Sequence, residues 1–203
     1  MADQFSRTRL LVGDEPLARL AAAKVAVFGV GGVGGFCVEA LARAGVGTLH
    51  LYDDDTVSES NLNRQIVALH STIGQPKAEV MARRILDINP ACQVEVFRMF
   101  YLPENADQVD LSQYDYVVDC IDTVAAKLDL VERCTALQVP ILSAMGSGNK
   151  LDPTAFRVTD LSKTQGCPLA RVMRKELRKR GITHLKVVYS TEEPLTPLQP
   201  AEE

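Results

Sequence analysis

The sequence predicts an α/β fold, a Rossmann-like doubly wound sheet whose strands are mostly parallel. Short apolar runs that are typical of buried strands alternate with segments of helical periodicity. The strand-like run 25–28 leads directly into the glycine-rich stretch 29–34, and the run 116–121 ends at Asp122. Such alternation is typical of parallel sheets that helices cover on both faces.

Each predicted element has its own start or stop signal. A mostly apolar helix follows the glycine-rich stretch and ends at Gly45 and Gly47. Pro76 is expected to start another helix at its first position, and Asn89 and Pro90 stop it. The other elements of this part are predicted at 48–52, 93–96, 116–121, 123–137 and 141–144.

A short strand-helix-strand extension is predicted toward the C-terminus. Strands at 156–158 and 185–189 flank a helix at 168–180. Three prolines and four glutamates follow, so residues 191–203 are expected to form a disordered, acidic tail. The chain is therefore divided into one domain, residues 1–190, and this tail.

Length and composition exclude several classes of protein. The chain has 203 residues, 46% hydrophobic and 24% charged, which suits one α/β domain. A net charge of −4 excludes an overall basic nucleic-acid binder, and no DNA partner is expected. The five cysteines form no Cys-x-x-Cys pair, which indicates reduced thiols and argues against structural zinc. No apolar run is long enough to span a bilayer and no signal peptide is recognisable, so a cytoplasmic protein without membrane association is expected.

The glycine-rich stretch is the first candidate part of a nucleotide site. Gly29, Gly31, Gly32 and Gly34 allow tight passage of the backbone between a strand and a helix. Main-chain amides and the helix N-terminus can then face an anionic phosphate. The alternative is a close packing of strand on helix without any ligand.

Asp53 is the second candidate part. It lies nineteen residues after Gly34, at the end of the predicted strand 48–52. An acidic side chain in this place can accept hydrogen bonds from a ribose. The alternative is a solvated turn, and Asp54 or Asp55 could take the same role.

The residues after this acid favour ATP cleavage over hydride transfer. Asn61, Arg64, Gln65 and Lys77 would individually more often be surface or capping residues, but they are clustered. A dehydrogenase needs no pair of cations beside its nucleotide, whereas an enzyme that cleaves ATP must neutralise a triphosphate. Asp122, at the end of its strand, is placed to hold Mg²⁺ on the phosphates, with a helix N-cap as the alternative.

These motifs together resemble the adenylation domain of the ThiF/MoeB group, relatives of the ubiquitin-activating enzymes. The resemblance extends from about Phe5 to Ser190. The matching runs are Gly29-x-Gly-Gly-x-Gly34, Asp53-x-Asp-x-Val57-x-x-Ser60-Asn61-Leu-x-Arg64-Gln65, Gly74-x-x-Lys77 and Asp119-x-x-Asp122.

The resemblance implies ATP-dependent adenylation of a carboxylate, with ATP and Mg²⁺ as cofactors. It implies that Asn61 and Arg64 contact the reacting phosphates, Lys77 the triphosphate and Asp122 the metal. Arg7 matches an arginine that reaches into the partner subunit's site, which implies a homodimer.

Within the group, the chain is most similar to the members that act on a modified adenosine of tRNA. The features are Arg9-Leu10-x-x-Gly13, Gly148-Asn-Lys-Leu-Asp152-Pro153-Thr154 and Val158-Thr-Asp160-Leu-x-Lys163-Thr164. In those members a carboxylate next to the anticodon is adenylated and then captured within the same molecule, so no catalytic cysteine is required. They continue for some tens of residues past the position of Ser190, so this chain resembles a shortened form.

Three other functions stay open on the sequence. Activation of the C-terminus of a ubiquitin-like or sulfur-carrier protein is the main alternative, although the zinc cysteines are missing; a sulfur-relay protein is a candidate partner. The others are a nicotinamide-dependent oxidoreductase and a non-catalytic ATP-binding scaffold.

The predicted helix 168–180 carries six basic residues and one acid. We expect it to contact tRNA phosphates, with a solvated charged face as the alternative. The residues predicted to make these contacts are Arg171, Arg174, Lys175, Arg178 and Lys179.

Overall fold

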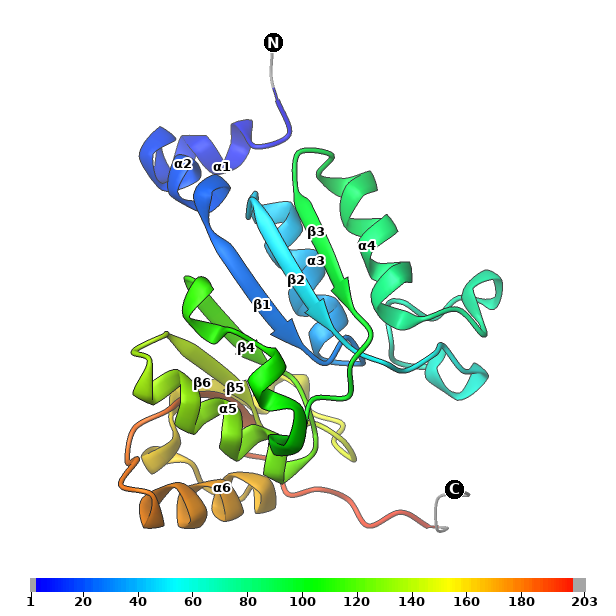
Figure 1. The fold of residues 1–203 in the computed structure, drawn as a ribbon. Coiled ribbons are helices and arrows are strands. Elements are labelled where there is room, and N and C mark those ends of the chain that lie inside the picture. Colours follow the sequence, from blue (N-terminus) through cyan, green and yellow to red (C-terminus); the bar gives the residue numbers. More distant parts are fainter. Residues whose placement is uncertain (1–2, 199–203) are drawn as a thin grey trace.

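A computed structural model describes residues 3–198 as an α/β fold around a single sheet (Figure 1). Seven strands follow the order β3-β2-β1-β4-β5-β7-β6. They pair in parallel throughout, except for β6 and β7, which are antiparallel at one edge. This confirms the predicted Rossmann-like, mostly parallel sheet. The strands are β1 (Lys24–Phe28), β2 (Thr48–Tyr52), β3 (Gln93–Phe97), β4 (Tyr116–Asp119), β5 (Ile141–Ala144), β6 (Phe156–Asp160) and β7 (Lys186–Ser190).

Helices cover both faces of the sheet. Of these, α3 (Gly34–Ala44) and α4 (Lys77–Ile88) pack on one face, while α5 (Val124–Ala136) and α6 (Pro168–Lys179) pack on the other (Figure 1). Alternate residues of β1 pack into the cores on the two faces of the sheet, because successive side chains of a strand point to opposite faces. Val27 belongs to the core under α3 and α4, and Phe28 to the core under α5.

Two short helices at the N-terminus were not predicted. They are α1 (Ser6–Val12) and α2 (Asp14–Ala22), and neither contains a buried residue. Arg9 of α1 forms exposed ion pairs with Asp3 and with Asp14 of α2, at 2.9 Å and 2.7 Å. Both helices lie at the amino end of the sheet, where α2 leads into β1 (Figure 1).

Most predicted boundaries hold within a residue or two. The predicted helix stop at Gly45 is confirmed, because this glycine has φ +91° and caps α3. One start differs: Pro76 is extended, with ψ 129°, and bridges to Thr56, so that α4 begins at Lys77.

The predicted tail is described only in part. Residues 191–198 contain no helix or strand. The Glu192 carboxylate accepts a hydrogen bond of 2.9 Å from the Leu151 amide and one of 3.0 Å from the Asp152 amide. Residues 199–203 lie outside the described residues, so the disordered tail stays a prediction. None of the helices between residues 3 and 198 has the length and apolar character needed to cross a membrane.

Candidate active site

A cleft of about 510 Å³ opens at the carboxyl ends of the central strands. Its walls come from the glycine-rich stretch, the loops after β2, β3, β4 and β5, and the starts of α4 and α6. Parallel strands present their carboxyl ends at one edge, which is where open α/β sheets bind ligands. The predicted site residues that line the cleft are Gly29, Gly31, Gly32, Asp53, Arg64, Gln65, Lys77 and Asp122.

Gly29 and Gly34 are required by the close passage of the chain. Gly29 has φ +85°, and a Cβ atom there would lie 2.9 Å from the carbonyl oxygen of Cys120. A Cβ atom on Gly34 would overlap the carbonyl oxygen of Gly29. For these two positions, close packing of strand on helix is a sufficient explanation.

Gly31 and Gly32 have a different environment. A Cβ atom on either would find its nearest neighbours 3.8 Å away, on the side chains of Gln65 and Arg64. Both glycines line the cleft immediately before α3. In the first turn of this helix the amides of Gly35 and Cys37 already donate to the carbonyl oxygens of Gly31 and Val33, at 3.0 Å and 3.2 Å, so the space above Gly31 and Gly32 is the feature that favours a ligand. This part of the stretch is therefore suited to a phosphate that approaches the backbone.

Asp53 joins the glycine-rich stretch to the loop after β2. Its Oδ2 atom accepts a hydrogen bond of 2.6 Å from the Val30 amide, and Oδ1 accepts one of 2.9 Å from the Asp55 amide. Burial raises the pKa of the Asp53 carboxyl, against the opposing effect of these two amides. Asp54 and Asp55 are exposed, so the solvated-turn alternative describes them and not Asp53.

Lys77 reaches the cleft from the first residue of α4. Although it is only 5% exposed, its ammonium group remains paired, because Nζ lies 2.8 Å from Oδ2 of Asp55. The Lys77 amide also donates a hydrogen bond of 2.9 Å to the Asp55 carbonyl oxygen. Asp55 therefore fixes both the start of the helix and its cation.

Arg64 is an exposed cation that also lines the cleft. Its Nη1 atom donates hydrogen bonds of 3.0 Å to the Ser60 carbonyl oxygen and 2.9 Å to Oδ1 of Asn63. A guanidinium group has five N–H donors, so these two contacts orient it and leave donors for an anion.

Asn61 holds the turn that carries Arg64 and does not line the cleft. Its buried side chain accepts a hydrogen bond of 3.1 Å from the Ser58 amide, and its carbonyl oxygen accepts one of 3.1 Å from the Arg64 amide. The predicted contact of Asn61 with phosphates therefore stays a prediction, and its visible role is to hold the turn.

Gln65 is buried in the wall of the cleft. Its Oε1 atom has no hydrogen-bond partner among residues 3–198. A buried acceptor without a partner is costly, which suits a ligand in the cleft that donates a hydrogen bond to this oxygen.

Asp122 is exposed at the cleft, in the loop after β4. The N-cap residue of α5 is Thr123, so the alternative of Asp122 as the N-cap is wrong. Within the part of the chain that the structure describes, no group of three His, Cys, Asp or Glu residues could hold a metal. Mg²⁺ is usually held by one or two carboxylates together with phosphates, an arrangement that Asp122 can serve.

A buried ion pair beneath Asp122 was not recognised in the sequence. The Lys127 ammonium lies 3.0 Å from both carboxylate oxygens of Asp119 and 2.7 Å from the Ile121 carbonyl oxygen. Asp119 also accepts a hydrogen bond from the Ser143 hydroxyl. Because Lys127 holds the carbonyl of the residue just before Asp122, it positions this loop. The available signal was a lysine at the second turn of a helix, eight residues after a strand-end aspartate.

Two further residues bear on the chemistry. Arg7 is exposed on α1, at the end of the sheet opposite the cleft, and does not line it (Figure 1). Cys120 does line the cleft, but burial raises the pKa of its thiol, which disfavours the nucleophilic thiolate. All five cysteines are free in the structure, and their reduced state stays a prediction.

The fold and the cleft define a Rossmann-like nucleotide-binding protein with two cations at its ligand site. More specifically, the chain belongs to the ThiF family, whose model matches residues 5–190. The family resemblance read from the motifs is thereby confirmed.

Individual relatives are similar over almost the whole chain. The tRNA threonylcarbamoyladenosine dehydratase of Bacillus subtilis is 48% identical over 196 residues, which are 96% of this chain and 77% of that protein. The tRNA threonylcarbamoyladenosine dehydratase of Escherichia coli is 42% identical over a region that covers 93% of this chain and 74% of that protein. A crystal structure of the Escherichia coli enzyme, TcdA, in complex with ATP has a TM-score of 0.90 at 41% identity, covering 96% of this chain and 83% of that one.

Proposed function

We propose that this chain is an ATP-dependent enzyme that adenylates and then cyclises the threonylcarbamoyl side chain of a modified adenosine in tRNA. One observation carries the proposal. Arg64 and Lys77 meet Asp53 and the glycine-rich stretch on a single cleft, in a chain 48% identical to a tRNA threonylcarbamoyladenosine dehydratase.

The reaction has two steps that balance without a protein nucleophile. A carboxylate oxygen of the substrate attacks the α-phosphorus of ATP, and pyrophosphate leaves. A nucleophilic atom of the same side chain then attacks the activated carbonyl carbon, its proton passes to a base or to solvent, and AMP leaves with the former carboxylate oxygen. The oxygen lost from the substrate is therefore the one that formal dehydration removes.

The residues of the cleft divide the binding of ATP among them. Asp53 is suited to the ribose hydroxyls, and Gly31 and Gly32 to the phosphates. Arg64 and Lys77 supply positive charge where negative charge develops, which is usually the largest contribution to such catalysis. Mg²⁺, when bound, adds charge neutralisation on the phosphates, and Asp122 is the carboxylate that we expect to hold it.

We further expect a homodimer in which Arg7 enters the cleft of the partner. Within one chain Arg7 is far from the cleft, so only a second copy could bring it there. A shallow hollow beside the cleft is lined mainly by apolar residues, among them Phe36 and Phe156, which are 55% and 36% exposed. Val158, also exposed, extends this surface along β6. Burial of such side chains against a second copy would be favourable.

A sulfur-relay protein partner, a cytoplasmic location and the classification as a ligase stay predictions.

The test is turnover of tRNA that carries threonylcarbamoyladenosine, followed by mass spectrometry of its nucleosides. With ATP, the protein should convert this nucleoside to a product lighter by one water. Arg64→Ala or Lys77→Ala should lower turnover by about 10²-fold or more, on the scale of losing one electrostatic stabiliser. Arg83→Ala, an exposed arginine of α4 that does not line the cleft, is the control and should keep full turnover.

Two results would contradict the proposal. Near-normal turnover of both cation variants at saturating ATP would remove these residues from the mechanism. Adenylation of a sulfur-carrier protein, with no change in the tRNA nucleoside, would instead favour the carrier-activating alternative.

A further inference from the structure

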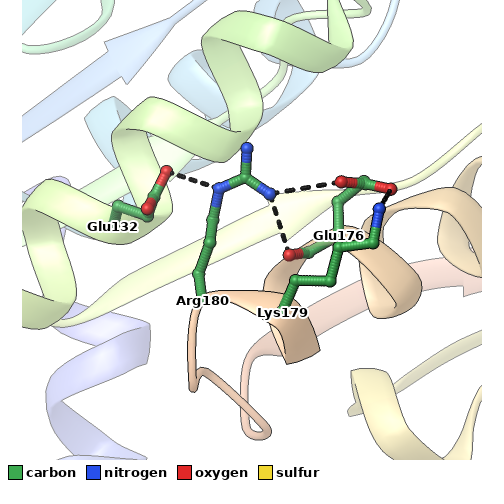
Figure 2. Close-up of polar contacts among 4 residues, drawn as sticks. All are labelled: Glu132, Glu176, Lys179 and Arg180. Atoms are coloured by element: carbon green, nitrogen blue, oxygen red, sulfur yellow. Dashed lines mark hydrogen bonds and ion pairs between the residues drawn. The ribbon is translucent and has the colours of Figure 1, made fainter.

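The cations of the basic helix α6 fall into two groups, and those of the first group form ion pairs or hydrogen bonds with other residues of the chain. Arg180 lies between Glu132 of α5, at 2.9 Å, and Glu176, at 3.3 Å, while Lys179 lies 2.7 Å from Glu176 (Figure 2). Lys179 is the main cause of the lowered pKa of the Glu176 carboxyl. The contact of Arg180 with Glu132 joins the C-terminal end of α6 to α5, and the two contacts with Glu176 lie within the end of α6 itself.

Arg174 also serves the protein. Its Nη1 atom donates hydrogen bonds to the carbonyl oxygens of Leu161, at 3.3 Å, and Thr164, at 3.0 Å, and to the Thr164 hydroxyl. It therefore holds the loop after β6 against the helix. Arg174 and Lys179, both predicted to contact tRNA, are thus engaged within the chain.

The second group consists of Arg171, Lys175 and Arg178, here called the basic stripe. All three are exposed, and their side chains make no ion pair or hydrogen bond with any residue between 3 and 198. Spacings of four and three residues place them on one side of a helix. They span about 10 Å along its axis, at about 1.5 Å per residue.

The rest of α6 limits what the basic stripe can bind. A basic amphipathic helix can lie on a membrane or dock in a partner's groove, but its apolar face must then be available. Here Ala170, Met173 and Leu177 are at most 1% exposed and belong to the core under the helix. Apart from Val172, which is 42% exposed, the exposed side chains of α6 beyond its first turn are charged, which suits a hydrophilic polyanion.

The position of the helix connects the stripe to the cleft. Leu169, in the first turn of α6, lines the cleft, and Arg171 follows two residues later. We propose that the basic stripe binds consecutive phosphates of the tRNA backbone and so directs the modified nucleoside to the cleft. This inference rests on the proposed function, since it assumes that the substrate is tRNA.

The experiment compares two variants with equal loss of charge on the same helix. Lys175→Gln with Arg178→Gln removes one lysine and one arginine from the basic stripe. Lys179→Gln with Arg180→Gln removes the same two residue types, but from side chains that are paired with Glu176 and with Glu132 of α5 (Figure 2). Binding of a fluorescent tRNA bearing threonylcarbamoyladenosine is measured by anisotropy across a salt series, and folding by thermal unfolding.

The stripe variant should bind tRNA about tenfold or more weakly, and the slope of log affinity against log salt should become less steep by about 1.5 to 2. Its KM for tRNA should rise while its KM for ATP stays unchanged. The control variant should differ little from the unaltered protein, because its side chains face Glu132 and Glu176.

Three outcomes would overturn the inference. Equal weakening in both variants would show a general field effect, and no weakening in either would place the tRNA surface elsewhere. Binding of vesicles rich in anionic phospholipid, lost only in the stripe variant and with tRNA affinity unchanged, would assign the stripe to a membrane. Each of these outcomes can be distinguished from failure of the proposed function, because in that case the unaltered protein would not convert the tRNA nucleoside at all.

Discussion

Asp53 has two tasks whose requirements conflict. Its carboxylate must be ionised to accept hydrogen bonds from a ribose, yet it is half-buried, and burial raises its pKa. The amides of Val30 and Asp55 oppose this shift by donating to the charged form. The residue therefore joins the glycine-rich stretch to β2 and also remains a potential ligand for the nucleotide.

This conflict predicts a pH dependence for ATP binding. A protonated Asp53 loses acceptors, so affinity should fall as pH falls through its raised pKa, earlier than for an aspartate at the ordinary value of 3.8. Asp53→Asn should bind more weakly, and the ratio of its Kd to that of the unaltered protein should shrink toward one in acid. Using the ratio removes the titration of ATP itself. Calorimetry at several pH values checks this, and a ratio that does not change would contradict it.

Without ligand, the same shift has the opposite consequence for folding. The folded state holds the proton of Asp53 more tightly than the unfolded chain does. This contribution to stability is present below pH 3.8 and is lost as pH rises from there through the folded pKa.

The ion pair of Lys127 with Asp119 gives a second prediction at this scale. Both side chains are fully buried, so Lys127→Met leaves an unpaired buried carboxylate and should cost about 3–5 kcal/mol in the free energy of unfolding. Adding Asp119→Asn should recover part of this loss, because the uncompensated charge is gone. Urea unfolding of both single variants and the double variant measures the coupling. Additive losses would show that the pair does not act as a unit.

Much of the site could be predicted from local sequence. The residues at the ends of β1, β2 and β4 meet at one edge because parallel strands end together, and this rule brings Gly29, Asp53 and Asp122 to one cleft. Lys127 could not be predicted in the same way, because its partner Asp119 and the burial of both depend on how α5 packs on β4. Sequence position alone makes it an ordinary helical lysine.

At the scale of elements, the strands and the sheet-covering helices were predictable, whereas α1 and α2 were not. Apolar periodicity marks a helix that packs on a core, and these two contain no buried residue. The half-buried Leu20 packs α2 against the core, and exposed ion pairs of Arg9 with Asp3 and Asp14 link the two helices. In α6 the burial of Met173 and Leu177 was predictable, whereas Val172, on the same predicted face, is 42% exposed. The division of the cations was not predictable, because it depends on Glu132 and on the loop after β6.

At the scale of the whole molecule, the cleft alone leaves Arg7 without a role. The predicted site includes this residue, yet α1 lies at the other end of the sheet (Figure 1). The exposed Phe36, Phe156 and Val158 lie beside the cleft or on the neighbouring edge strand. A homodimer would account for both observations if the surface that covers these side chains also carries Arg7 of the second copy.

The dimer predicts complementation between two inactive variants. Arg7→Ala and Arg64→Ala each remove one cation from every site of their own homodimers, so each should have little turnover. In a mixed dimer with two-fold symmetry, one site lacks both residues and the other has both. After complete exchange of equal amounts, half of the dimers are mixed, so about a quarter of the unaltered turnover should return. Exchange is followed by native mass spectrometry of protomers of different mass. The control is a mixture of Arg83→Ala with Arg64→Ala, whose turnover should equal the sum of the two separate activities. If exchange is complete and the first mixture stays inactive, Arg7 does not act across a dimer.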